Sequence, residues 1–108
     1  MRILLDEQMP LEVAPFFGNA HEVRTVKDMG WFSVKNGELL RQADQSGFDF
    51  FITMDKSLRH QQNLAKLTMR FIVLRALDNK IEMLSPCVPM ILAYLDSGQF
   101  EKLKEIRA

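Results

Sequence analysis

The sequence predicts a three-layer α/β/α domain, in which helices cover both faces of a mostly parallel sheet of four to five strands. Three short apolar segments favour this fold, because aliphatic and aromatic residues follow one another there without regular polar alternation. Such runs are typical of strands that are covered on both faces, as in a parallel sheet. The segments between them have helical character, and strands that alternate with helices indicate parallel pairing with right-handed crossovers. The three runs are residues 2–6, 48–54 and 70–74.

Length and composition indicate one ordinary globular domain over residues 1–108. Fourteen basic residues balance fourteen acidic ones, which excludes a global positive field, so any nucleic-acid binding requires a local patch. The single cysteine, Cys87, excludes an internal disulfide and fits a reducing compartment. No segment approaches the roughly 20 apolar residues of a membrane span, and the apolar start is too short for a signal peptide. We therefore expect a cytoplasmic protein without a membrane partner.

The first strand, residues 2–6, ends on the acid Asp6. Pro10 then suits the first turn of a helix, because its fixed φ matches the helix and its missing N–H needs no partner there. Apolar residues continue this helix for about two turns. Gly18-Asn19 ends it in the manner of a C-cap.

The next segment predicts an edge strand and a loop that contains two aromatic residues. Residues 21–26 alternate and include β-branched side chains, which fits a half-exposed strand near the edge of the sheet. The following loop, residues 27–37, holds Trp31 and Phe32. Such residues hold a loop to the core, form a homodimer contact, or stack on a nucleobase. We favour the first two roles.

Two helices are expected on either side of the strand at 48–54. The first begins near Asn36, which suits an N-cap, and ends at Ser46-Gly47. The second is short and covers residues 64–67. Leu39, Leu40 and Ala43 give the first helix its apolar face.

The longest predicted helix, residues 81–95, follows the strand at 70–74. Asn79 and Glu82 have the spacing of a capping box at its start. Pro86 and Pro89 each remove a backbone donor, so we expect a break or kink there. The tail at 100–106 fits a last edge strand or a helical turn, and its periodicity does not decide between them.

Two of the predicted strands have an aspartate at their carboxyl end. Asp6 ends the strand at 2–6, and Asp55 follows the strand at 48–54. In open α/β sheets, ligands bind outside the carboxyl ends of the strands. Neighbouring strand axes lie about 4.8 Å apart, so both carboxylates can share one cation if these two strands are neighbours. Mg²⁺ and Mn²⁺ fit, because they take oxygen ligands, usually one or two carboxylates with water and substrate phosphate.

Glu38 falls in the first turn of a helix that opens toward the same edge. Asp6, Glu38 and Asp55 together would form a catalytic, metal-binding cluster suited to phosphodiester hydrolysis. Each acid also has a structural interpretation, because aspartate caps helices and glutamate is favoured in a first helical turn. A phosphatase is less favoured, because its nucleophile is usually followed by a second acid two residues on, where this chain has Gln8 and Ser57.

The polar segment after Asp55 predicts contacts to a phosphate backbone. Its cations and amides suit that role, and Lys56, Arg59 and Asn63 are the expected substrate-binding residues. The alternative is a solvated loop. One cysteine with two histidines cannot form a usual zinc site.

Five segments carry a family resemblance that covers nearly the whole chain. They are Met-Arg-Ile-Leu-Leu-Asp-Glu at 1–7, His-Glu-Val-Arg-Thr-Val at 21–26, Asn-Gly-Glu-Leu-Leu at 36–40, Gly-Phe-Asp-Phe-Phe-Ile-Thr-Met-Asp-Lys at 47–56 and Gln-Gln-Asn-Leu at 61–64. With them the chain resembles the small bacterial PIN-like proteins, formerly filed as a domain of unknown function and related to the toxin nucleases of toxin–antitoxin pairs.

The resemblance implies a PIN-like fold and a Mg²⁺- or Mn²⁺-dependent ribonuclease site, in which Asp6, Glu38 and Asp55 match the acid positions. It also implies RNA as the substrate and an antitoxin protein as the partner. PIN nucleases often have a fourth acid, for which this chain has no convincing counterpart. A catalytically inactive module that binds RNA or protein is therefore the alternative.

Overall fold

The computed structural model describes residues 1–60 and 63–108, and in them five strands form one parallel sheet. The strand order is β2-β1-β3-β4-β5, and every neighbouring pair is parallel. The predicted α/β fold with a parallel sheet is confirmed. The strands are β1 (Arg2–Leu5), β2 (Glu22–Thr25), β3 (Phe50–Thr53), β4 (Arg70–Arg75) and β5 (Leu103–Arg107).

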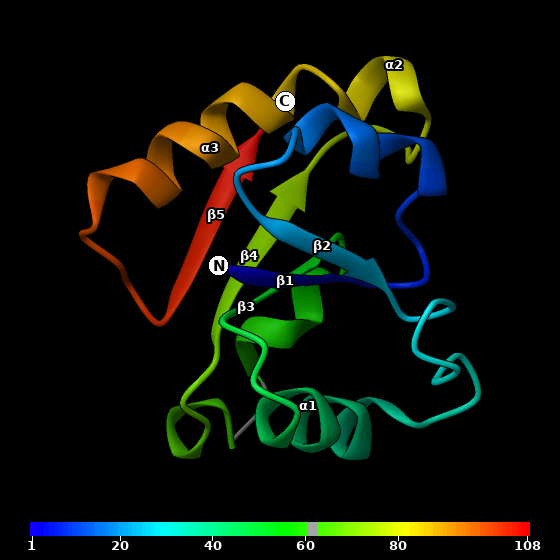
Figure 1. The fold of residues 1–108 in the computed structure, drawn as a ribbon, viewed down its shortest axis with the longest axis vertical. Coiled ribbons are helices and arrows are strands. Elements are labelled where there is room, and N and C mark those ends of the chain that lie inside the picture. The colour runs from blue at the N-terminus through cyan, green and yellow to red at the C-terminus, as the bar shows by residue number, and fades with distance from the viewer. Residues whose placement is uncertain (61–62) are drawn as a thin grey trace.

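Helices lie on both sides of this sheet, as a three-layer fold requires. Figure 1 shows α2 and α3 along one side of the strands and α1 along the other. The described α-helices are α1 (Asn36–Gln45), α2 (Ile81–Leu84) and α3 (Cys87–Ser97). Three 3₁₀ helices accompany them, namely η1 (Leu11–Phe17), η2 (Lys56–His60) and η3 (Leu64–Lys66). None of the helices in the described part of the chain has the length and apolar character needed to cross a membrane.

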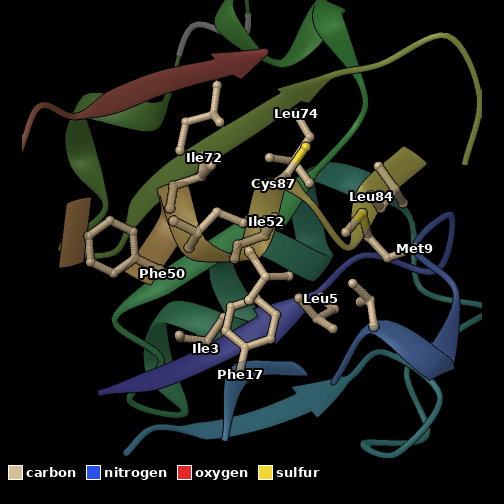
Figure 2. Close-up of a cluster of buried hydrophobic side chains, with 14 of the residues drawn as sticks. Ile3, Leu5, Met9, Phe17, Phe50, Ile52, Ile72, Leu74, Leu84 and Cys87 are labelled. Carbon is tan, nitrogen blue, oxygen red and sulfur yellow. The ribbon is translucent and has the colours of Figure 1, made fainter. Parts of the chain in front are cut away.

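The central strands divide the core into two clusters, because successive side chains on a strand point to opposite faces. Ile3 and Leu5 of β1 face a cluster that includes residues of η1, α2 and α3 (Figure 2). Leu4, between them, faces a second cluster with Leu39 and Leu40 of α1. Both faces of β1 are therefore covered, which explains why its sequence shows no polar alternation. Burial raises the pKa of the Cys87 thiol in the first cluster, so this cysteine is poorly suited to act as a nucleophile.

The strand order decides three questions about position in the sheet. β1 pairs with both β2 and β3, so the strands that precede Asp6 and Asp55 are direct neighbours. β2 lies at one edge of the sheet, as its alternating pattern predicts. β5 lies at the opposite edge, which decides between the two alternatives for the tail in favour of a strand.

Helix boundaries differ from the expected ones where a tertiary contact intervenes. The predicted capping box is wrong, because α2 begins at Ile81 with Lys80 at the N-cap, and no side chain caps it. The amide of Asn79 instead donates to the carbonyl oxygen of Gln8, at 3.0 Å. At the start of α1 the N-cap position is Lys35, and Asn36 is the first helical residue, so that predicted cap is also displaced.

The prolines act as expected at one of two positions. α2 ends at Leu84 and α3 begins at Cys87, so the predicted break falls at Pro86. Pro89 lies in the first turn of α3, where a backbone N–H has no intrahelical partner, and the helix continues through it. The helix at 11–17 forms as a 3₁₀ helix with Pro15 inside it. Gly18 ends that helix with a positive φ of 71°, and its N–H donates to the Pro15 carbonyl.

The two loop aromatics have opposite surroundings. The Trp31 ring packs edge-on against Phe48, with 6.1 Å between ring centroids, and joins the second core cluster. Phe32 is 64% exposed. Trp31 therefore holds the loop to the core, and Phe32 is the residue left for a contact with a ligand or a partner.

This difference predicts unequal losses of stability on truncation. Trp31→Ala is expected to lower the free energy of unfolding by about 2 kcal/mol, less than a fully buried tryptophan because the ring is half-buried. Phe32→Ala is expected to change it by less than about 0.5 kcal/mol, as exposed substitutions usually do. Urea unfolding followed by circular dichroism measures both. Equal losses in the two variants would contradict the assignment of Trp31 to the core.

Candidate functional site

Two aspartates come together at the carboxyl ends of β1 and β3. Asp6 follows β1 directly, and its backbone N–H donates to the carbonyl oxygen of Ile52 at 2.9 Å, so the strand pairing extends to this residue. Asp55 lies two residues beyond the end of β3. The alternation of side chains places Asp6 on the α1 side of the sheet, together with Leu4 and Thr53.

The hydroxyl of Thr53 links the two aspartates. It donates to Asp6 Oδ2 at 2.6 Å and accepts the backbone N–H of Asp55 at 3.0 Å. Thr53 has no solvent exposure, and Asp6 and Asp55 are half-buried, so both bonds are partly shielded from competing water. A hydrogen bond from a hydroxyl to a carboxylate at this distance is a strong, charge-assisted one. Thr53 therefore fixes the position of the Asp6 carboxylate relative to the chain at Asp55.

The other carboxylate oxygens keep free acceptor capacity. Asp6 Oδ1 accepts the Glu7 N–H at 2.8 Å, and Asp55 Oδ1 accepts the N–H and the hydroxyl of Ser57 at 3.0 and 2.7 Å. Asp55 Oδ2 accepts no hydrogen bond from the residues that the structure describes. Each oxygen has two lone pairs, so both aspartates retain positions at which a cation could bind.

Asp6 and Asp55 line one small pocket whose volume is about 10 Å³. That volume is close to the minimum that a single bound water occupies. The only side-chain atoms in its lining that could coordinate a metal are oxygens, which are the ligands that Mg²⁺ and Mn²⁺ prefer. Two carboxylates are a usual number for Mg²⁺. The residues present therefore fit a hard divalent cation. The remaining lining residues are Leu39, Leu40, Phe51, Thr53 and Leu58.

Glu38 is not part of this pocket. It is exposed in the first turn of α1, on a stripe with Arg41, Gln42 and Gln45 that has i, i+3, i+4 and i+7 spacing. Its neighbours Leu39 and Leu40 face the aspartates instead. Within residues 1–60 and 63–108, no three His, Cys, Asp or Glu side chains gather closely enough to hold one metal ion. A direct role for Glu38 at the cation stays a prediction.

The structure separates the predicted substrate contacts. Lys56 and Arg59 belong to η2, whose buried Leu58 anchors it, and both lie toward the ends of β4 and β5. Asn63 instead lines a pocket of about 430 Å³ with residues of α1 and η3. Gln61 and Gln62, which belong to the same polar segment and to the family resemblance, lie outside the described residues.

Sequence reasoning assigned no role to three residues that the structure places at this edge. Thr53 is part of the Thr-x-Asp segment, and that spacing is the signal that could have pointed to it. Arg75 and Arg107 are the last residues of β4 and β5 and line a pocket with Lys56. The position of Arg107 could not be predicted while the tail remained undecided between strand and helix.

Asp6 also lines a second pocket, of about 300 Å³, together with Glu7, Thr25 and Lys27. Its walls include Met9, Leu11 and the exposed Phe32. If a loop aromatic stacks on a base, Phe32 is therefore the one in position to do so beside Asp6.

Comparison with known proteins finds no family model, curated protein or solved structure that matches the chain. We therefore infer the function from the side chains at the carboxyl end of the sheet.

Proposed function

We propose that this chain is a PIN-like, metal-dependent endoribonuclease in which Asp6 and Asp55 bind Mg²⁺ or Mn²⁺. One observation carries the proposal. The buried hydroxyl of Thr53 ties the Asp6 carboxylate to the backbone of Asp55 at the ends of two adjacent parallel strands. A fixed pair of carboxylates at this place in an α/β sheet suits a cation that acts on a phosphodiester.

The protein groups have separate tasks in this proposal. A bound cation supplies Lewis acidity at the phosphate and lowers the pKa of a coordinated water. Thr53 holds Asp6, and Ser57 holds one oxygen of Asp55 so that the other is free of protein hydrogen bonds among the described residues. Glu38 assists or orients water from the first turn of α1. Lys56 and Arg59 contact the RNA next to the aspartates, with Asn63 as a further predicted contact.

The family resemblance extends the proposal to the biological setting. It supports a role for this chain as the toxin of a toxin–antitoxin pair, with an antitoxin protein as its partner. The cytoplasmic location and the homodimer contact expected from the sequence belong to the same proposal.

A second function is favoured by the position of Glu38. With Glu38 on the outer stripe of α1, only two acids line the pocket between the strand ends. A site with too few acids for catalysis would leave a PIN-like module that binds RNA or protein without cleaving it.

Cleavage of a labelled RNA by the purified wild-type chain decides between these functions. We expect cleavage with Mn²⁺ or Mg²⁺, none in EDTA, and recovery when excess Mn²⁺ is added back. Isothermal titration calorimetry should show that the protein binds Mn²⁺. Cleavage that persists in EDTA would contradict the metal-dependent mechanism. RNA binding without cleavage under any divalent cation would establish the binding module instead.

A further inference from the structure

Two arginines lie side by side at the carboxyl ends of β4 and β5. Arg75 and Arg107 are partners in the strand register, so they share one face of the sheet on adjacent strands. Like charges on directly opposite strand positions destabilise a sheet. Arg75 is offset by Glu105, with 3.4 Å between Nη1 and Oε1. Arg107 forms no ion pair with any residue in the described part of the chain.

The carboxylate of Glu105 is shared, so it offsets little of the local charge. Arg59 also pairs with it, with 3.1 Å between Nη1 and Oε1. Lys56 adds a further cation, since it lines the same pocket as Arg75 and Arg107. The pocket has a volume of about 320 Å³, and its other walls are Ala76, Leu77, Met83 and Ala108, none of which has an acidic side chain. We call it the basic pocket.

The basic pocket supplies the local positive patch that the neutral net charge of the chain makes necessary. Arginine suits phosphate in particular, because its planar fork donates two parallel hydrogen bonds to the oxygens. Arg59 and Arg75 pair with Glu105, and Lys56 and Arg107 line the pocket with Arg75, so basic side chains outnumber acidic ones here and attract a polyanion.

The basic pocket and the aspartate pair share one end of the sheet. Lys56 directly follows Asp55, β4 is the next strand after β3, and β5 is the one after that. With about 4.8 Å between strands, Arg75 and Arg107 lie one and two strand positions beyond the strand that carries Asp55. A polyanion that crosses the strand ends would contact the aspartates' cation and then the basic pocket.

The geometry points to the basic pocket as the binding site for RNA phosphates that flank the cleaved one. This inference rests on the proposed function for the identity of the polyanion. It assigns substrate contacts to Arg75 and Arg107, makes Glu105 a positioning residue for Arg59 and Arg75, and extends the RNA-binding surface from the aspartates toward β5.

The test measures RNA affinity by fluorescence anisotropy in EDTA, where the proposed cleavage cannot occur, at several salt concentrations. The first variant combines Lys56→Ala with Arg107→Ala, two exposed positions. The matched control combines Lys66→Ala with Arg41→Ala, which removes the same two residue types, also exposed, from the pocket that contains Asn63. Urea unfolding verifies that both variants remain folded.

For single strands each phosphate contact contributes about −0.7 to the slope of log K against log salt, so each lost contact makes that slope shallower by this amount. We expect the slope to become shallower by about 1.4 in the first variant and to stay unchanged in the control. An unchanged slope in the first variant, an equal change in both, or a wild type without salt-dependent RNA affinity would overturn the inference. Its failure is distinct from failure of the proposed nuclease, because the binding assay contains no metal and the cleavage assay requires it.

Discussion

Replacing Asp55 or Asp6 by asparagine is expected to lower Mn²⁺-dependent RNA cleavage by about 10³-fold. Each substitution keeps the size and shape of the side chain and removes one of the two negative charges at the pocket between the strand ends. A metal ion contributes several kcal/mol to stabilising the transition state, and each 1.4 kcal/mol corresponds to about a factor of ten in rate. Single-turnover cleavage at saturating Mn²⁺ measures the loss of rate, and the Mn²⁺ dissociation constant measures the loss of affinity for the cation.

The matched control is Asp96→Asn, which makes the same chemical change at an exposed position on α3. It should leave cleavage unchanged, and a contaminating nuclease would be equally active in all three proteins. Combining Asp6→Asn with Asp55→Asn should cost little more than either change alone, because residues that act as a unit are not additive. Cleavage that survives in the double variant would remove the aspartate pair from the mechanism.

Thr53→Val is expected to lower cleavage by about 10- to 100-fold, the usual cost of losing a partner that orients a metal ligand. Valine preserves the buried volume, but it leaves Asp6 Oδ2 and the Asp55 N–H without the hydroxyl that joins them. Buried polar groups that lose their partner cost about 1–3 kcal/mol each, so the free energy of unfolding should also fall. Urea unfolding and the Mn²⁺ dependence of cleavage report the two effects separately.

Thr53→Ser separates positioning from packing at the same site. Serine keeps the hydroxyl and loses one buried methyl group, so stability should fall by about 1 kcal/mol while cleavage stays close to wild type. If Thr53 has only a structural role, the valine and serine variants will retain equal activity per folded molecule. A weaker Mn²⁺ affinity in the valine variant alone would identify Thr53 as the residue that positions Asp6.

The fold could be predicted because its signals are local. The unbroken apolar runs in β1, β3 and β4 exist because both faces of those strands are covered. The helix caps could not be predicted in the same way. Asn79 has the right spacing for a cap, but its amide bonds to the carbonyl of Gln8, seventy-one positions earlier in the chain. A contact of that kind depends on the tertiary arrangement, which the local pattern does not contain.

The candidate site shows the same division between local and tertiary information. From sequence, Asp6 and Asp55 could be paired only on the condition that the two covered strands they follow are neighbours, and the structure meets that condition. Glu38 was placed by its position in a first helical turn and by motif, and the rotation of α1 that buries Leu39 and Leu40 turns it toward the outer stripe. Arg75 and Arg107 meet only through the β4–β5 register, which the ambiguous tail concealed.

The parallel sheet also bears on how the candidate site forms during folding. β1 and β3 are adjacent in space, but residues 6–49 separate them in the chain, and no described strand pair is a hairpin. Closing long loops before strand contacts form makes such topologies slow to fold. The hydrogen bond from Thr53 to Asp6 therefore requires the β1–β3 pairing, whereas the bond from the Asp55 N–H to Thr53 is local to the end of β3. A partly folded species that lacks this pairing would also lack the proposed cation site, so divalent-cation binding is expected to appear during refolding only when β1 and β3 have paired.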